Sequence, residues 1–253
     1  MRGEAVPDLH TTWDLMLRRL ERRTPLGESG RRALLSLPRT TRRVGAGGHV
    51  VRDGDLPDSC ALLLSGFAYR YKLTGEGGRQ IISLHMPGEW LDLQHMFLGV
   101  ADTSVQTLTE AEVDFVPRAA IEELALANAD VARAFWIDTL IDSSIFREWV
   151  VNVGRRDSRA RVAHILCEFS LRLEAAGLAR NHVYELPMTQ EQLADAVGLT
   201  AVHVNRVLKQ LGEQGLIDRD RRTIRIVDWK RMREVGDFNE RYLHHDANAI
   251  RGG

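Results

Sequence analysis

Residues 186–217 constrain the fold of this chain more than any other stretch, because they combine two helix starts with a glycine turn. Thr189 and Gln192 have the spacing of a capping box, in which each side chain satisfies a free backbone amide at a helix start. Gly198 supplies a left-handed residue to end that helix, and Thr200 can cap a second helix directly after it. Apolar residues recur on one face of each predicted helix: Leu193, Ala194 and Val197, then Val204, Val207, Leu208 and Leu211. Two short amphipathic helices joined by a tight turn make a helix-turn-helix.

A basic β-hairpin is predicted directly after the second helix. Residues 216–217 and 223–227 are rich in β-branched side chains, and the polar turn 218–222 separates them. Four arginines of this hairpin suit contact with phosphates: Arg219, Arg221, Arg222 and Arg225. Two plainer interpretations stay open, since paired helices occur in many helical domains and a charged hairpin is often simply solvated. A winged helix-turn-helix that binds DNA accounts for both features together.

The second predicted helix, residues 200–211, is the candidate for insertion into the major groove. Arg206 is the best candidate for a base edge, because arginine to guanine O6 and N7 is the commonest specific contact. Asn205 suits adenine or a phosphate, His203 suits a phosphate oxygen, and the apolar Ala201 and Val202 suit a thymine methyl. The predicted DNA-binding set is Thr189, Gln190, Thr200, Ala201, Val202, His203, Asn205, Arg206, Lys209, Arg221 and Arg222.

These residues resemble a known family. The pattern T-x-x-x-L-A-x-x-x-G-L-T-x-x-H-V-N-R-x-L-x-x-L over residues 189–211 is similar to the DNA-binding signature of the Crp/Fnr superfamily of bacterial transcription regulators. Residues 50–71 resemble the opening strands of that family's cyclic-nucleotide-binding-type barrel, and Pro87-Gly88-Glu89 resembles the Gly-Glu of its ligand cassette. The resemblance implies a homodimer that binds an inverted-repeat operator and acts together with RNA polymerase. Ala201 and Val202 depart from the polar readers that relatives often carry.

The expected fold is α+β, in four segments. Residues 1–126 hold N-terminal helices and a β jelly-roll barrel, 127–154 a long dimerisation helix, 155–233 the winged helix-turn-helix, and 234–253 a weakly ordered tail. The long helix has a broad apolar surface, which can be buried within one chain or can face an identical helix. By resemblance it is the dimerisation helix, with a predicted interface of Phe135, Ile137, Ile141, Ile145 and Trp149.

The ligand of the predicted barrel stays open. Gly88 and Glu89 are the candidate ligand residues, but no Lys or Arg occurs from residue 80 to 117 to neutralise a cyclic phosphate. Because a buried phosphodiester without a cation is costly, cyclic AMP is not expected. The family's iron–sulfur sensors need a cysteine cluster that this N-terminus lacks. Haem sensing would draw on His85, His95 or Cys60, and an unknown small-molecule effector is the broader alternative; no cofactor or metal is predicted.

Bulk properties agree with a two-domain regulator. The 253 residues carry a formal net charge of −1, yet residues 155–231 hold 14 Lys and Arg against 10 Asp and Glu, and the remainder 20 against 25. A basic region beside an acidic one is expected when a single domain touches phosphate, whereas a regulatory module without DNA contact would lack it. No apolar run approaches about 20 residues and no signal peptide is evident, so a cytoplasmic protein is expected.

Neither catalysis nor a disulfide framework is predicted. Two cysteines are too few and too far apart for a framework or a four-thiolate metal site, and Cys167 is expected to be a buried, inert thiol. Glu89, Asp92 and His95 are possible catalytic groups by residue type, but no catalytic motif unites them. Asp92 and His95 are expected to form a surface pair.

Overall fold

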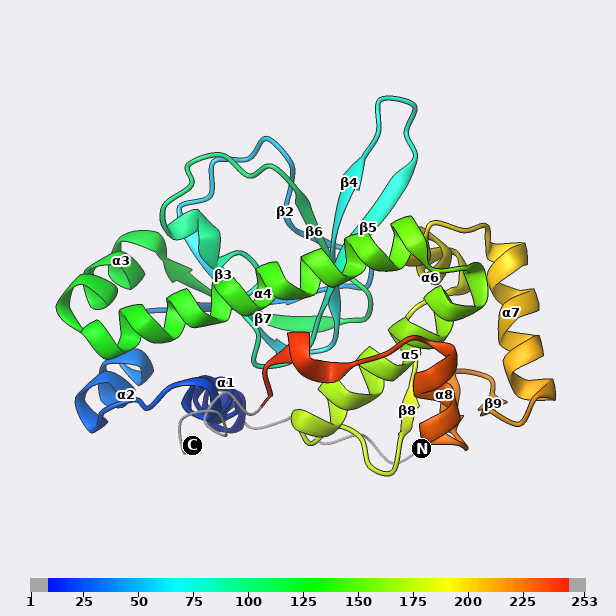
Figure 1. Cartoon of the computed structure of the whole chain (residues 1–253). Coiled ribbons are helices and arrows are strands. Elements are labelled where there is room, and N and C mark those ends of the chain that lie inside the picture. Colours follow the sequence, from blue (N-terminus) through cyan, green and yellow to red (C-terminus); the bar gives the residue numbers. More distant parts are fainter. Residues whose placement is uncertain (1–8, 246–253) are drawn as a thin grey trace, which may run out of the picture. The chain divides into compact units, whose positions relative to one another are not determined.

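The computed structural model describes residues 9–245, with side chains from residue 12 onward. The chain divides into two compact units (Figure 1). The first unit comprises residues 9–72, 84–142 and 244–245, and the second comprises residues 73–83 and 143–243. No helix within the described residues is both long and apolar enough to cross a membrane.

Two antiparallel sheets form the barrel. One sheet has the order β1 (Thr40–Val44), β7 (Ala111–Pro117), β3 (Ser59–Ser65). The other has the order β2 (His49–Val51), β6 (Ser104–Thr107), β4 (Ala68–Leu73), β5 (Arg79–His85). Strands far apart in sequence are neighbours, with β1 on β7 and β2 on β6, as in the jelly roll that the sequence predicted. Buried residues from both sheets, including Leu63, Val105 and Val113, form the barrel core.

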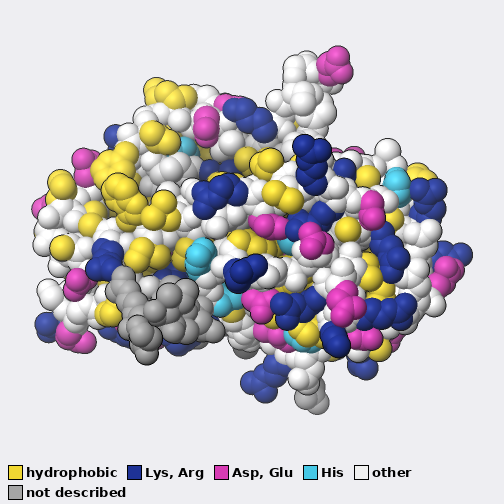
Figure 2. Space-filling model, in the orientation of Figure 1, with side chains coloured by type: hydrophobic (Ala, Val, Ile, Leu, Met, Phe, Trp, Pro, Cys, Tyr) yellow, Lys and Arg dark blue, Asp and Glu magenta, His cyan; other side chains and the backbone are white. Residues whose placement is uncertain are grey.

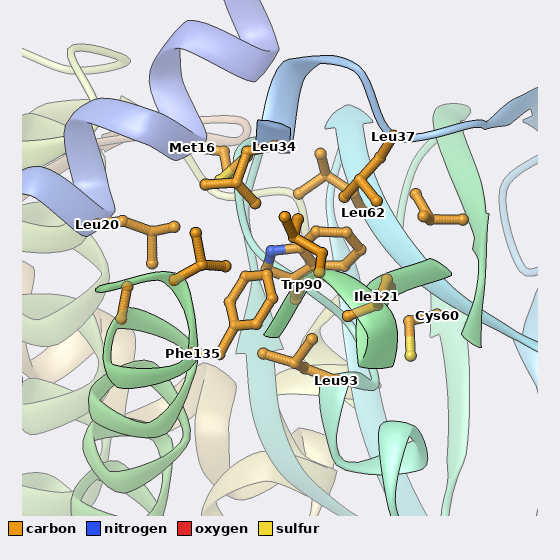
Figure 3. Close-up of a cluster of buried hydrophobic side chains, with 14 of the residues drawn as sticks. Met16, Leu20, Leu34, Leu37, Cys60, Leu62, Trp90, Leu93, Ile121 and Phe135 are labelled. Carbon is orange, nitrogen blue, oxygen red and sulfur yellow. The ribbon is translucent and has the colours of Figure 1, made fainter. Parts of the chain in front are cut away.

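Four helices pack around the barrel in the first unit. They are α1 (Leu9–Arg23), α2 (Glu28–Leu35), the 3-10 turn η1 (Leu93–Met96) and α3 (Arg118–Ala127). The indole of Trp90 lies at the centre of their shared core (Figure 3). Its ring meets Trp13 of α1 edge-on at 6.2 Å and Phe135 at 6.0 Å. This aromatic cluster joins α1, the barrel and the start of the next helix.

The long helix α4 (Ala129–Arg155) forms where the sequence predicted it, but its apolar surface is divided differently. Of the five residues predicted for the dimer interface, Ile137 is half-buried and four are buried: Phe135, Ile141, Ile145 and Trp149. Phe135 belongs to the Trp90 cluster, and the indole of Trp149 donates to Glu168 Oε2 at 3.0 Å. Phe135 and Trp149 are thus engaged inside the chain, and Ile141 and Ile145 are buried in it, so other residues of α4 are more accessible to a second copy than these four. Ile137 stays a prediction.

The second unit is built from three further helices that precede and form the helix-turn-helix, a small sheet and a C-terminal segment. The helices are α5 (Ser158–Ala175), α6 (Gln190–Val197) and α7 (Ala201–Glu213). The sheet has the order β8 (Val183–Glu185), β10 (Thr223–Ile226), β9 (Ile217–Asp220). The α+β fold with an N-terminal barrel, a long helix and a C-terminal winged helix-turn-helix is therefore confirmed. Sequence reasoning missed β8, which is only three residues long.

The C-terminal segment is more ordered than the sequence predicted. Residues 234–253 were expected to form a weakly ordered tail, but the last two residues of α8 (Trp229–Val235) and the 3-10 turn η2 (Glu240–Leu243) lie in its first half. Phe238 and Leu243 are buried, and Tyr242 donates a hydrogen bond to Glu168 Oε2 at 2.8 Å. Sparse apolar residues that find a tertiary partner account for the difference. Residues 246–253 lie outside the described part of the chain.

The divided surface of α4 predicts opposite results for two neighbouring aromatic residues. Phe135→Ala removes a ring that is 1% exposed and should lower the free energy of unfolding by about 3–5 kcal/mol. Trp136→Ala removes a ring that is 70% exposed and should change it by no more than about 0.5 kcal/mol in the monomer. Urea unfolding followed by circular dichroism at low protein concentration measures both. Equal losses would contradict this assignment of the two faces.

Candidate DNA-binding interface

The two helices of the helix-turn-helix begin and end as their sequence dictates. Thr189 Oγ1 accepts from Gln192 N at 3.1 Å, and Gln192 Oε1 accepts from Thr189 N at 2.9 Å, which completes the capping box. Gly198 ends α6 in the left-handed conformation, with φ of 64°. Thr200 Oγ1 then accepts from His203 N at 3.3 Å and caps α7. The sequence prediction of this turn is accurate residue by residue.

The helix α7 presents one face to the core and the other to solvent. Its buried face consists of Val204, Val207, Leu208 and Leu211, each at most 4% exposed. On the opposite face Val202 is 82% exposed, and Asn205, Arg206 and Lys209 are also exposed. A large apolar side chain this exposed in the first turn of a helix makes no contribution to the core. The outward face therefore combines one apolar and three polar or charged side chains.

Several of the predicted DNA-binding residues are already oriented by neighbours. His203 Nε2 lies 3.0 Å from Ser158 Oγ, and Gln190 Nε2 donates to Asn205 Oδ1 at 3.2 Å. Lys209 Nζ lies 3.7 Å from Glu213 in an exposed pair. Sequence reasoning missed Ser158, because nothing in its spacing marks it as a partner of His203. Within the described residues, no side chain holds the guanidinium of Arg206.

The hairpin after α7 has the geometry of a wing. Strand β9 pairs with β10 from Asp220 opposite Thr223 to Ile217 opposite Ile226, which leaves a two-residue turn at Arg221 and Arg222. Arg221 has φ of 52°, a left-handed conformation that a tight hairpin turn requires. Ile224 and Ile226 are buried on one face, as the alternating pattern predicted. The four wing arginines, Arg219, Arg221, Arg222 and Arg225, are all exposed.

The charge on this surface is mixed. Dark blue Lys and Arg side chains are spread over the part of the molecule where α5, α7 and α8 lie, with magenta Asp and Glu between them (Figure 2). In the wing itself Asp218 and Asp220 are exposed beside the arginines. The field that attracts nucleic acid is therefore local to particular side chains rather than a uniform basic face.

A buried polar network holds α5 to the end of α4 and to η2. Glu168 Oε2 accepts from the indole of Trp149 and the hydroxyl of Tyr242, and Glu168 Oε1 accepts from Arg172 at 3.1 Å. His164 lies beside it, with Nε2 3.0 Å from the Tyr242 hydroxyl. Burial, followed by the charge of Arg156, lowers the pKa of His164 to about 4, so its imidazole is neutral at neutral pH. The network fixes α5, on which the helix-turn-helix packs.

In the barrel, the predicted ligand residues form a tight turn. Gly88 has φ of 85°, and Glu89 is 8% exposed. Glu89 Oε2 accepts from Met86 N at 3.2 Å, and its other oxygen lies 3.8 Å from Arg19 Nε of α1. Both carboxylate oxygens of Glu89 thus have partners within the chain, the Met86 amide and Arg19.

The barrel contains a buried cation, Arg70, which lies outside residues 80–117. Residues 80–117 hold no Lys or Arg, but Arg70 of β4 is only 7% exposed. Its guanidinium donates to the carbonyl of Leu91 and lies 3.5 Å from Thr103 Oγ1. Burial lowers the pKa of Arg70, and nearby carboxylates, Asp142 first, partly offset that effect. The absence of Lys and Arg from residues 80–117 therefore does not leave the barrel without a buried cation, because β4 supplies Arg70.

The candidate haem ligands and catalytic groups are buried. His85, His95 and Cys60 are 4%, 1% and 0% exposed, and burial raises the pKa of the Cys60 thiol. Asp92 Oδ2 lies 3.5 Å from His95 Nδ1 with both side chains buried, so the expected surface pair is wrong. Asp92 also accepts from Ala61 N at 2.6 Å. Among the described residues, no group of three His, Cys, Asp or Glu is placed to hold a metal ion.

Comparison with known proteins covers both units. Residues 160–235 match the model of the Crp-like helix-turn-helix domain, and residues 41–128 match that of the cyclic nucleotide-binding domain. The chain is 31% identical over 208 residues to the nitrogen fixation regulation protein FixK of Rhizobium meliloti, covering 80% of this chain and 90% of FixK. It is 27% identical over 200 residues to the transcriptional activator protein FnrL of Cereibacter sphaeroides, covering 77% of this chain and 80% of FnrL.

The fold has the same relatives. The structure of FixK2 from Bradyrhizobium japonicum superposes with a TM-score of 0.73 at 26% identity, covering 79% of this chain and 98% of that one. The chain thus resembles proteins named for regulation and transcriptional activation in sequence, and FixK2 in fold. The chain belongs to the Crp/Fnr family of DNA-binding transcription regulators.

Proposed function

We propose that this regulator binds an inverted-repeat operator as a homodimer, with α7 of each copy in the major groove of one half-site. The exposed face of α7 carries this proposal, because it presents Arg206, which no side chain of residues 12–245 holds, and Val202, which is 82% exposed. Val202 and Arg206 are four residues apart and so lie about 5–6 Å apart on one helix face. Base pairs are stacked at about 3.4 Å, so the two side chains would reach neighbouring or next-neighbouring pairs.

The chemistry of each side chain suggests its target. Arg206 would bond guanine O6 and N7, and Val202 would contact a thymine methyl group. Asn205, held by Gln190, would reach adenine or a phosphate. The cap hydroxyls of Thr189 and Thr200 accept from backbone amides and keep their own protons for phosphate oxygens. Ala201, His203, Lys209, Arg221 and Arg222 complete the proposed set, with His203 oriented by its Ser158 contact.

Arg206→Ala should weaken binding to the selected operator by about 1–3 kcal/mol and relax the preference at one base position per half-site. Arg222→Ala is the matched control, because a wing arginine that meets phosphate should weaken all sequences alike and reduce the salt slope by about 1. Selection from a random DNA pool, followed by titration at several salt concentrations, separates the two. Unchanged specificity in Arg206→Ala would show that Arg206 does not contribute to the recognition of bases by α7.

The dimer surface that we propose lies on the face of α4 that the chain leaves uncovered. Trp136, Leu140 and Val150 are 70%, 53% and 68% exposed. Together with Ser143 and Arg147 they recur every three or four residues, which is the spacing of a coiled-coil seam. Hydrophobic side chains are gathered on the face over which α4 runs (Figures 1 and 2). A two-fold pair of α4 helices would bring two α7 helices to successive major grooves, about 34 Å apart.

Leu140→Asp should give a monomer in sedimentation at micromolar concentration, because it places a charge in the centre of an apolar seam. The monomer should lose at least about tenfold in operator affinity, since one half-site remains. Leu178→Asp, at a 46% exposed leucine of the second unit, makes the same change away from α4 and should stay dimeric. A dimer that survives Leu140→Asp, or a monomeric wild type on a non-symmetric site, would refute this seam.

We further propose that cyclic AMP is not the effector, despite the match to a cyclic nucleotide-binding domain. Glu89 is paired with Arg19, and Asp138 and Asp142 lie near the same arginine, so an anionic ligand beside Glu89 would meet carboxylates. Arg70 is already bonded to the Leu91 carbonyl. A haem or another small molecule stays the alternative for a sensor of this architecture. The activator names of FnrL and other relatives support action with RNA polymerase. A cytoplasmic location is part of the same proposal, because a transcription regulator acts on DNA.

Calorimetry with cyclic AMP and with cyclic GMP should show no binding at micromolar ligand, and neither nucleotide should raise operator affinity. The physical reason is the excess of carboxylates around Glu89. Arg70→Met provides the control. If the wild type does bind a cyclic nucleotide, loss of the binding heat in this variant would identify Arg70 as the partner of the phosphate. Micromolar binding with a gain of about tenfold in operator affinity would contradict the proposal.

A further inference from the structure

The helix α1 covers the Gly88–Glu89 turn of the barrel directly. A Cβ atom at Gly88 would lie 3.0 Å from Leu15 Cγ and 3.2 Å from Met16 N, so the glycine is what allows the helix this close. Thr12 donates to the Leu64 carbonyl at 3.1 Å, and the indole of Trp13 donates to Asp114 Oδ2 at 2.7 Å. Met16 and Leu20 then reach the Trp90 cluster (Figure 3). The face of the turn that points to α1 is filled by the chain itself.

Two arginines of α1 face three carboxylates that come from two other elements. Arg19 lies 3.8 Å from Glu89 of the turn, 3.1 Å from Asp138 of α4 and 3.9 Å from Asp142 of α4. Arg23 also pairs with Asp138. Four of the five side chains are at most 12% exposed, and Asp142 is 34% exposed. One guanidinium of α1 therefore bridges the ligand turn of the barrel and the long helix.

The two arginines offset the mutual repulsion of the three carboxylates. Glu89, Asp138 and Asp142 would repel one another in a site largely removed from water. Removal from solvent, followed by the neighbouring Asp138 carboxylate, raises the pKa of Asp142 to about 6, which is the mark of this crowding. Without Arg19 and Arg23, the buried carboxylates of Glu89 and Asp138 would have lost their cations, and this would weaken the contact of α4 with the turn. The attachment of α4 to the ligand turn thus depends on α1 for its electrostatic part, beside the apolar contact of Phe135 with Trp90.

We infer that α1 is an intramolecular ligand of the barrel: its Arg19 and Arg23 guanidinium groups fill an acidic site made by Glu89, Asp138 and Asp142, and fix the α4 arrangement required for operator binding. The ligand chemistry of this site is cationic and is supplied by the chain itself. A free effector at this turn would have to displace Arg19. The inference rests on the proposed DNA-binding function for its readout, while the site itself is tested separately.

The first test compares two arginines of the same helix. Arg19→Met keeps the aliphatic stem and removes the charge, and Arg18→Met does the same at an exposed residue of α1. In the full-length protein, Arg19→Met should speed hydrogen exchange of the α4 amides in residues 129–142 by about tenfold and weaken operator binding by about tenfold. Arg18→Met should change neither. If Arg19→Met does not fold, Arg19→Lys keeps one charge but cannot bridge both partners, and should show the same losses to a smaller degree.

The second test restores the missing group. In Arg19→Ala, millimolar guanidinium chloride should recover operator affinity, whereas sodium chloride at equal ionic strength should not. Both salts screen DNA contacts equally, so the difference isolates the site. Guanidinium should have no such effect on the wild type, whose site is filled.

The outcomes separate this inference from the proposed function. Operator affinity within twofold of the wild type in folded Arg19→Met would overturn it, as would no recovery by guanidinium, because α1 would then be only a structural helix. Failure of the wild type itself to bind any selected DNA would refute the proposed function. In that case the exchange of the α4 amides still decides whether Arg19 holds α4.

Discussion

The structure depends on how α4 divides its apolar residues between two opposite faces. One face is buried within the chain: Phe135 packs on Trp90, and the indole of Trp149 donates a hydrogen bond to Glu168. The other face keeps Trp136, Leu140 and Val150 in solvent. The buried face packs within each unit, and the exposed face is the surface that we propose for a second copy.

Charge is the second constraint, and it acts at the places where elements meet. Arg19 lies between Glu89 and Asp138, so the attachment of α4 beside the ligand turn is electrostatic as well as apolar. At the other end of α4, Glu168 gathers three donors in a buried network. Buried carboxylates are costly unless they are paired, so each of these groups specifies one arrangement of its neighbours. Both ends of α4 are thus fixed by polar contacts within an apolar setting.

The proposed interface with DNA follows a different rule, since its residues are exposed or half-buried and several of them are oriented by neighbouring side chains. Val202 and Arg206 have no role in the core, and the wing arginines lie beside aspartates rather than in a uniform basic field. Specific recognition in this protein would therefore come from a few side chains on α7, with the wing adding phosphate contacts. The caps and the Ser158 and Gln190 contacts set the positions from which those side chains act.

The sequence by itself determined the local structure of the helix-turn-helix, because its signals are local. The capping box at Thr189, the left-handed Gly198 and the cap at Thr200 are each decided by residues within one helical turn, and all three are found. The family and its fold followed from the same pattern. Only the tertiary structure decided which face of α4 is buried, because periodicity shows that a helix is apolar but not which neighbour covers it. It likewise decided that Arg70 of β4 is buried in the barrel and that Arg19 lies beside Glu89, 70 residues further along the chain. Contacts between residues so far apart produce no regular spacing in the sequence, so the sequence pattern could not predict them.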